Sequence, residues 1–554
     1  MKNKIILILI LVLATFLRLI KLGNLPNSYT PDELAQGYTA YSILTTGKDE
    51  WGSGDWLNLR SFGDYKPPLQ TLLMIPSIKI FGLTPFAVRF PNAFISIFTI
   101  LLTYLLANQF FKNKKIGLLS ALFMAISPWS LPMSRIALEA NLVVFIISLA
   151  TFLFLKAVKN KNYFLFTLSI FIFGISLFTY HSAKVFTPLL LIILFFYKNL
   201  YRHKSFTLIL ILIFGASFLF HYQSTHKIKS SRTNDIAIFN PTDKWQAVSD
   251  TQYEITQSGL PYLVVKVFYN KLVYLGEIFT RNYFSYFSPQ FLITQGAGET
   301  TYGMIPGFGV LGIIPTIGLI FSLLLLLKPD SKNSPKELVL IGLIILIVPL
   351  IASLAKGSYS ANRVSLMMPF IQIFSAAGII LFFKNIPQNI KKTIVFIFII
   401  IFTFNSLCFF QRYFFQGNQI LSKGMLYGHQ QAINFIKNNS QIDQVIYSRK
   451  LSEPQAYVTF FEKVNPKITQ LFSSNWLEYE SKKLLFLDQL GEYNLDKYTF
   501  RELSISSDKK LHNTILVGRP DEFLDTKPDY IIHYPSAIDP SAAIYIVDTS
   551  LHER

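Results

Sequence analysis

Cysteine is almost absent from this 554-residue chain, and the one present, Cys408, lies inside an apolar run. A single cysteine cannot form an intrachain disulfide, and it does not suggest a cysteine-based zinc site. The common nucleotide and zinc motifs are missing as well, because the sequence has no GxxxxGK loop, no GxGxxG after a strand and no HExxH. A nucleotide-dependent mechanism and a zinc enzyme are therefore not supported.

Charge is also scarce. Only 15% of the residues are charged, 51% are hydrophobic, and the mean hydropathy is +0.39. This composition is too apolar for an ordinary soluble chain and predicts a polytopic α-helical membrane protein. The net charge of +19 does not indicate a nucleic-acid partner, because much of the Lys and Arg lies in short connectors between apolar runs.

About eleven apolar segments are long enough to be candidate spans. The first has no small-residue cleavage pattern, so we expect it to be retained rather than removed as a signal peptide. If all eleven cross, the basic connectors fall on the same side as the N-terminal MKNK, which predicts a cytoplasmic N-terminus and an outer C-terminal tail. The candidate spans are residues 4–22, 88–110, 116–132, 141–157, 163–180, 185–200, 206–222, 303–327, 338–355, 364–384 and 393–411.

This topology places two long loops, about 23–87 and 223–302, on the outer face together with the tail, 416–554. The tail contains a helical pattern in QQAINFIKNNS and strand-like runs in QVIYS, DYIIHY and AAIYIVD. We therefore expect a small α/β extracytoplasmic domain, in which no catalytic motif is evident. No internal repeat is visible, which weakens a transporter interpretation.

The first outer loop contains the most informative short stretch, Thr30-Pro31-Asp32-Glu33. Threonine, proline and a glutamate three residues after the threonine predict a capping box, followed by a helix on the bilayer interface. Capping this helix is therefore one sufficient explanation for Glu33. Asp32 would lie in the positive field of the helix terminus. Its carboxylate either only stabilises the helix through this dipole or accepts a proton from a hydroxyl.

Further along the loop, Asp49, Glu50 and Asp55 are expected to be solvated charges. Lys66 precedes two prolines and a short apolar run, which suggests a second interfacial helix. Two interpretations of Lys66 stay open, an anchor at the headgroups or a contact to a lipid phosphate.

Other ionisable residues lie near the expected outer face, where a functional role is a reasonable hypothesis. Arg135 and Glu139 are four apart on an expected helix and can pair with each other. Lys184 and Arg363 are either anchors or part of a phosphate-sized basic lining. A carboxylate-rich loop can also hold a divalent cation such as Mg or Mn. The remaining candidates near this face are Arg89 and His181.

The order of PDE, FGDYKPPL, AVRFPNA, ISPWSLPMSRIALEAN and NRVSLMMPF resembles the GT-C superfamily of membrane glycosyltransferases, specifically glycosyltransferase family 39. That family includes protein O-mannosyltransferases and is related to the lipid A aminoarabinose transferase. The resemblance covers residues 1–412. It implies that Asp32, with Glu33 beside it, is the catalytic base and that Lys66 contacts the donor phosphate. By local context it also implies phosphate contacts for Arg135 and Arg363 and a place in the pocket for Glu139. Asp64 and Tyr65 belong to the same motif as Lys66.

The resemblance implies inverting transfer of a sugar from a polyprenyl-monophosphate donor to an acceptor hydroxyl at the outer face of the cytoplasmic membrane. The acceptor is a protein, a lipid or a glycan, and no motif names the sugar, although mannose is usual for the family. One alternative stays open, a transporter or flippase of a lipid-linked sugar. The ordered acidic motifs of the first loop argue against a third class, a membrane-anchored binding module that acts through its tail.

Overall fold

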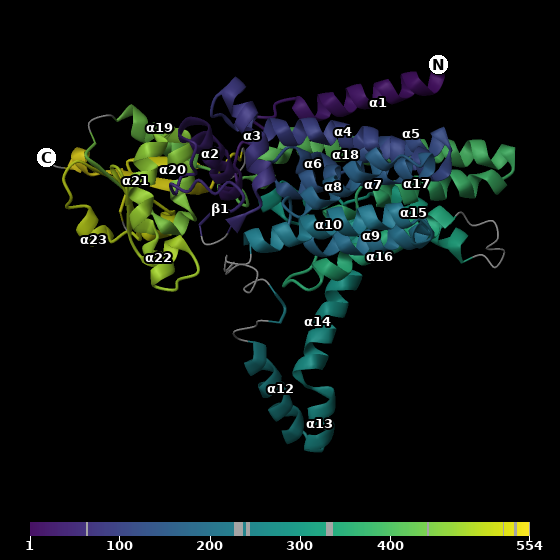
Figure 1. Cartoon of the computed structure of the whole chain (residues 1–554). Coiled ribbons are helices and arrows are strands. Elements are labelled where there is room, and N and C mark those ends of the chain that lie inside the picture. Colours follow the sequence, from purple (N-terminus) through teal and green to yellow (C-terminus); the bar gives the residue numbers. More distant parts are fainter. Residues whose placement is uncertain are drawn as a thin grey trace.

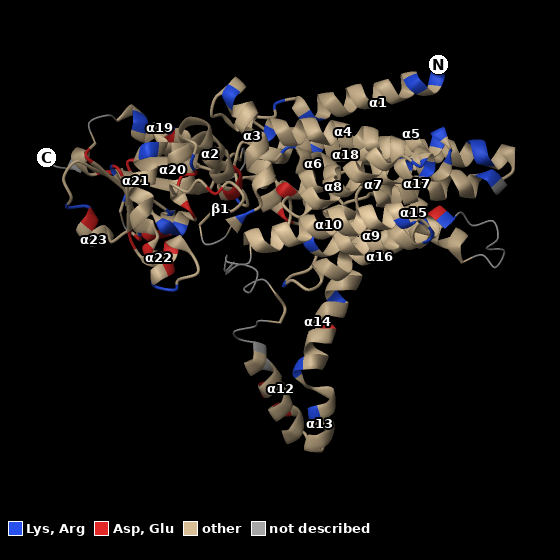
Figure 2. Cartoon of the chain, in the orientation of Figure 1, with Lys and Arg blue, Asp and Glu red and all other residues tan. Residues whose placement is uncertain are grey.

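The computed structural model describes residues 1–62, 65–225, 237–239, 244–327, 336–439, 442–524, 526–536 and 540–552. A helical bundle occupies one end of the molecule and an α/β unit occupies the other (Figure 1). Asp and Glu gather mainly at the α/β end, whereas the far end of the bundle carries mainly Lys and Arg (Figure 2).

A helix overlaps each of the eleven candidate spans. By length and composition, five helical segments in the described ranges can cross a membrane: α4, α7, α10, the segment Ser365–Phe382 that contains α17, and α18. The protein is thus a multi-pass helical membrane protein, and the number of eleven crossings stays a prediction. The bundle helices are α1 (Lys2–Leu19), α4 (Pro85–Phe111), α5 (Lys114–Ala125), α7 (Glu139–Asn160), α8 (Tyr163–Ser176), α9 (Ala183–Tyr197), α10 (Lys204–Thr225), α15 (Ile313–Leu326), α16 (Lys336–Ala352), α17 (Phe370–Phe382) and α18 (Gln388–Leu421).

Local sequence explains the sharp connections between these helices. α4 begins where the Thr84 side chain accepts a hydrogen bond from the backbone N–H of Ala87, with Pro85 at the first helical position. α7 ends at Lys161, which adopts the left-handed conformation with φ of 54°, and Asn162 then caps α8. Such short turns keep consecutive helices antiparallel and adjacent.

Residues 244–285, which belong to the second long loop of the expected topology, form an arm that projects sideways from the bundle (Figure 1). Its helices are α12 (Lys244–Gln257), α13 (Tyr262–Phe268) and α14 (Lys271–Ser285).

The tail contains one mixed sheet in which six strands are described, in the order β4-β5-β3-β6-β8-β7. The central strand β3 (Gln444–Ser448) is parallel to both neighbours. Helix α19 (His429–Asn438), β3, β7 (Tyr530–His533) and β8 (Ala542–Asp548) lie where the sequence patterns indicated them. The patterns missed α20 (Pro454–Glu462), α21 (Pro466–Trp476), β4 (Tyr493–Leu495), β5 (Tyr498–Arg501) and β6 (Thr514–Gly518).

The first loop and the tail share one hydrophobic core. Helix α2 (Pro31–Thr46) packs against α20 and α21, and the Tyr38 hydroxyl lies 2.7 Å from that of Thr469. Trp51 contacts Trp476 edge to face, with ring centroids 5.6 Å apart. The expectation that α2 lies on the bilayer interface is therefore wrong, because protein covers its apolar residues. Residues 23–87 and the tail form one packed unit rather than separate parts.

Candidate active site

The site begins at the N-terminus of α2. Thr30 is the N-cap, and its hydroxyl oxygen accepts a hydrogen bond of 3.1 Å from the backbone N–H of Glu33. Pro31 occupies the first helical position, as the sequence predicts. The expected return bond from the Glu33 carboxylate does not form, because this carboxylate pairs with Arg89 instead.

Glu33 and Arg89 form a buried ion pair. The two nitrogen–oxygen distances are 2.6 and 3.1 Å, and the side chains are only 1% and 0% exposed. The guanidinium lies over the Tyr29 ring and also donates to three backbone carbonyls that precede α2, those of Leu22, Pro26 and Ser28. This arrangement fixes the chain that enters α2. A catalytic role for Glu33 and a pocket role for Arg89 are not supported, because neither group can reach a substrate.

Asp32, the neighbour of Glu33, faces a different environment. Its carboxylate lies 2.9 Å from the ammonium of Lys66, and the side chains are 24% and 12% exposed. Lys66 is held by a short antiparallel pairing of β1 (Leu59–Arg60) with β2 (Tyr65–Lys66), immediately before α3 (Pro68–Phe81). The structure thus brings together the predicted base and the predicted phosphate ligand, and both are accessible.

Glu139 joins this group from α7. It interacts electrostatically with both Lys66 and Asp32, and its carboxylate accepts a hydrogen bond of 2.9 Å from the Gln36 side chain. Gln36 lies one turn after Asp32 on α2. Its role in orienting Glu139 was missed by the sequence analysis, which had no local signal for a contact between α2 and α7.

A small cavity of about 150 Å³ adjoins Lys66. Its polar lining combines four sequence-predicted residues with three that were missed. The predicted residues are Tyr65, Lys66, His181 and Lys184, and the missed ones are Asn58, His221 and Thr225. His221 interacts electrostatically with Lys184 and belongs to α10, where an imidazole near the end of an apolar run was the available signal. The size and the basic lining suit a phosphate better than a whole sugar.

Arg135 does not join this lining. It is fully buried and donates to four backbone carbonyls at and after the end of α1: Leu17, Arg18, Ile20 and Leu25. The predicted pairing with Glu139 is wrong, because residues 135–138 lie between α6 (Ser130–Ser134) and α7 and interrupt the expected helix. Arg135 instead satisfies terminal carbonyls of α1, as a cation near a helix C-terminus does.

Arg363 lies in the segment before α17. Its guanidinium donates to the backbone carbonyls of Lys356 and Gly357, at 2.6 and 3.4 Å. It interacts electrostatically with Glu299, whose carboxylate accepts a hydrogen bond from the Ala361 N–H. Burial raises the pKa of Glu299, which the sequence analysis did not single out. Contact between Arg363 and a donor phosphate stays a prediction.

Two sequence expectations, a pocket role for Asp64 and a bound divalent cation, are not tested by the described residues. Asp64 lies outside the described residues. In the described ranges no three His, Cys, Asp or Glu side chains lie together as a metal site. Binding of Mg or Mn stays a prediction, because such a cation can also be held by one or two carboxylates together with substrate phosphates.

Comparison with known proteins bears on the family and on the fold. Residues 65–222 match the family model of the dolichyl-phosphate-mannose-protein mannosyltransferases. An uncharacterized protein of Aquifex aeolicus is 31% identical over 165 residues, a match that covers 28% of this chain and 33% of that protein. The match therefore spans only about a third of the relative's length.

Among solved structures, the fold is similar to that of ArnT from Cupriavidus metallidurans. The structure bound to undecaprenyl phosphate superimposes with a TM-score of 0.53 at 11% identity and covers 97% of each chain. The apo structure gives 0.54 at 10% identity and covers 98% of each chain. At this identity the likeness shows the fold.

Residues 65–222 are therefore mannosyltransferase-like. The chain as a whole has the fold of ArnT, and both findings support the resemblance to the GT-C membrane glycosyltransferases.

Proposed function

We propose that this protein transfers a sugar from a polyprenyl-monophosphate donor to an acceptor hydroxyl, with inversion at the anomeric carbon. The observation that carries the proposal is the 2.9 Å contact between Asp32 and Lys66 beside a basic cavity. A partly exposed carboxylate next to a phosphate-sized basic lining provides the two groups that this reaction needs.

In the proposed reaction, the acceptor oxygen attacks the anomeric carbon while Asp32 accepts the hydroxyl proton. The new carbon–oxygen bond forms on the face opposite the leaving group, and the bond between the anomeric carbon and the phosphate oxygen breaks. The polyprenyl phosphate departs with the bonding electron pair. Lys66 and Lys184 stabilise its developing charge, so the leaving group needs no general acid.

The comparisons support the proposed type of donor, and features of the sequence support the proposed location. The ArnT neighbour binds undecaprenyl phosphate and the matching family is named for dolichyl-phosphate mannose, which supports a lipid-linked hexose donor and makes mannose the first sugar to test. The basic connectors support an N-terminus in the cytoplasm. The active site and the tail would then face outward from the cytoplasmic membrane.

Release of free polyprenyl phosphate from a panel of polyprenyl-phosphate hexoses tests this proposal, with the purified full chain in detergent and a mixture of protein, lipid and glycan acceptors. A transferase needs no sealed membrane, so one donor should be consumed with formation of a glycosylated product. A flippase would leave every donor intact in detergent and move it only in sealed vesicles, which would overturn the proposal.

A further inference from the structure

A second cavity lies at the end of the bundle away from the tail. It has a volume of about 490 Å³, within the range of small-molecule pockets. Helices α5, α15, α17 and α18 line it, so it lies between membrane helices and not in the candidate active site. Its wall is mainly apolar, with aromatic side chains such as Phe123, Phe398 and Phe402.

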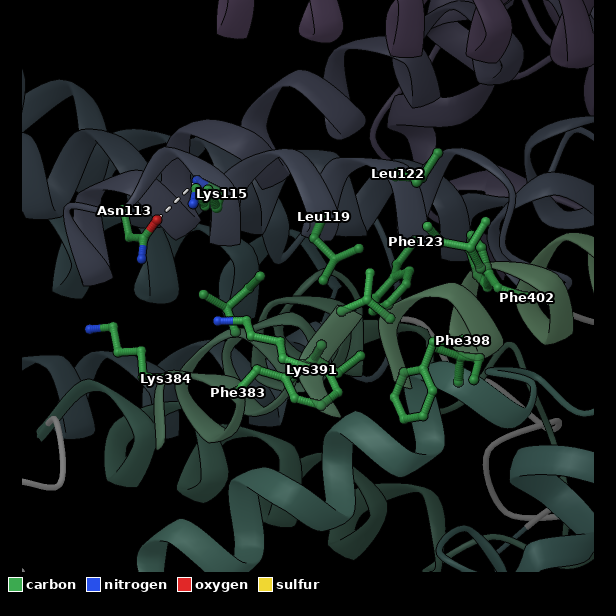
Figure 3. Close-up of a pocket in the computed structure, with 15 residues that line it drawn as sticks. Asn113, Lys115, Leu119, Leu122, Phe123, Phe383, Lys384, Lys391, Phe398 and Phe402 are labelled. Carbon is green, nitrogen blue, oxygen red and sulfur yellow. Dashed lines mark hydrogen bonds between the residues drawn. The ribbon is translucent and has the colours of Figure 1, made fainter. Parts of the chain in front are cut away.

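The polar residues of this groove gather at one end. Figure 3 shows the side chains of Lys384 and Lys391, together with Lys115 and Asn113, opposite the end formed by Leu122 and Phe402. None of the ion pairs between described residues includes any of these three lysines. The four lining helices also contain no Asp or Glu, so no carboxylate on them neutralises the lysines.

The groove opens toward the outside of the bundle along α18, most of whose apolar residues are not covered by protein. Only 6% of the apolar window of α18 is buried, compared with 83% for the segment Ser365–Phe382. Val395 and Ile399 of α18 line the groove while remaining 37% and 57% exposed. From Lys391 to Phe402 the helix rises by roughly 16 Å, enough to lie along part of an acyl chain.

We infer that this groove binds an anionic phospholipid, with the phosphate at Lys115, Lys384 and Lys391 and one acyl chain along α18. An apolar trough with cations only at its mouth matches an amphiphile that has a negative headgroup and a long chain. Basic pockets between membrane helices bind phosphate headgroups in this way. The inference concerns a site separate from Asp32 and does not rest on the proposed sugar transfer.

Native mass spectrometry of the detergent-purified full chain tests this inference, with phosphatidylglycerol, phosphatidylcholine of the same chains, and soluble glycerol phosphate as probes. We expect one tightly bound phosphatidylglycerol, weaker phosphatidylcholine and no retention of glycerol phosphate. The triple variant Lys115→Gln/Lys384→Gln/Lys391→Gln should bind phosphatidylglycerol roughly 100-fold more weakly, about fivefold for each lysine lost.

Two further variants control for misfolding and for general charge. Lys159→Gln/Lys161→Gln changes two exposed lysines, one in the last turn of α7 and one directly after it, and should leave binding unchanged. Leu119→Trp keeps all charges and narrows the groove, so it should weaken the binding of both phospholipids. Equal binding of phosphatidylglycerol by the wild type and by the triple variant would overturn the inference, as would equal affinity for the two phospholipids or tight binding of glycerol phosphate.

Discussion

The ammonium of Lys66 lies 2.9 Å from the carboxylate of Asp32, although the two residues belong to different elements of the first loop. The contact depends on the start of α2 and on the β1–β2 pairing. Lys66 therefore connects the proposed base to the cavity that contains His181 and Lys184. The arrangement predicts that loss of Lys66 affects chemistry and donor binding together.

Replacement Lys66→Gln should lower kcat/KM for the lipid-linked donor by about 10- to 100-fold, the usual range for loss of a hydrogen bond to a charged group. Steady-state kinetics with the donor found in the release assay measure this effect. Lys48→Gln, an exposed lysine of the same loop, is the matched control and should behave like the wild type. Similar kinetics for both variants would contradict a role for Lys66 in the active site.

The buried pair predicts a different outcome for Glu33→Gln. Because the change leaves Arg89 with an uncompensated buried charge, thermal stability should fall, and breaking such pairs costs about 3–5 kcal/mol. Activity per folded molecule should remain. Arg89→Met should cost still more, because three backbone carbonyls also lose their donor. Glu33→Gln protein with native stability but no activity would contradict the structural assignment.

Asp49 and Glu50 are only 0% and 4% exposed, so the expectation that they are solvated is wrong. The buried Glu50 carboxyl predicts a pH effect on stability. Burial, together with the nearby carboxylate of Asp49, raises the pKa of Glu50 to about 8 from its usual 4.5. Between these values the folded protein binds more protons than the unfolded chain, so stability should fall as pH rises from about 5 to 8. Thermal unfolding across this range measures the slope. Glu50→Gln should reduce this slope of stability against pH and raise stability at pH 8. An unchanged slope in this variant would show that another group causes the pH dependence.

The shared core predicts that the tail supports the active site. Trp476→Ala removes a buried ring that contacts Trp51 of the first loop, and such truncations cost about 3–5 kcal/mol. Both thermal stability and sugar transfer should decrease. Leu471→Ala on the same helix changes a side chain that is 70% exposed and should have little effect. Unaltered activity and stability in Trp476→Ala would argue that the two parts are independent.

The sequence was sufficient for features that depend on local pattern. Apolar run lengths located the bundle helices, and Thr30-Pro31 located the start of α2. The proximity of Asp32 and Lys66 came from the family resemblance, because no spacing rule brings a helix terminus to a strand. His221 and Gln36 were missed because their roles depend on contacts between distant elements.

The errors also have physical causes. The apolar face of α2 suggested a bilayer interface, but the same pattern suits burial against α20 and α21, and periodicity cannot tell lipid from protein. The phosphate contact of Arg135 was carried over from the family resemblance by local sequence context. Its actual partners are backbone carbonyls at the end of α1. A sequence motif does not indicate contacts to backbone carbonyls of a distant helix.

The most direct test of the central claim is the single-turnover rate of polyprenyl phosphate release by Asp32→Asn at saturating donor and acceptor. Asp250→Asn, an exposed carboxylate on α12, serves as the control. If Asp32 is the base, its replacement should slow release by at least about 100-fold with unchanged thermal stability, as expected for loss of general-base catalysis. Release at the wild-type rate by well-folded Asp32→Asn protein would contradict the account.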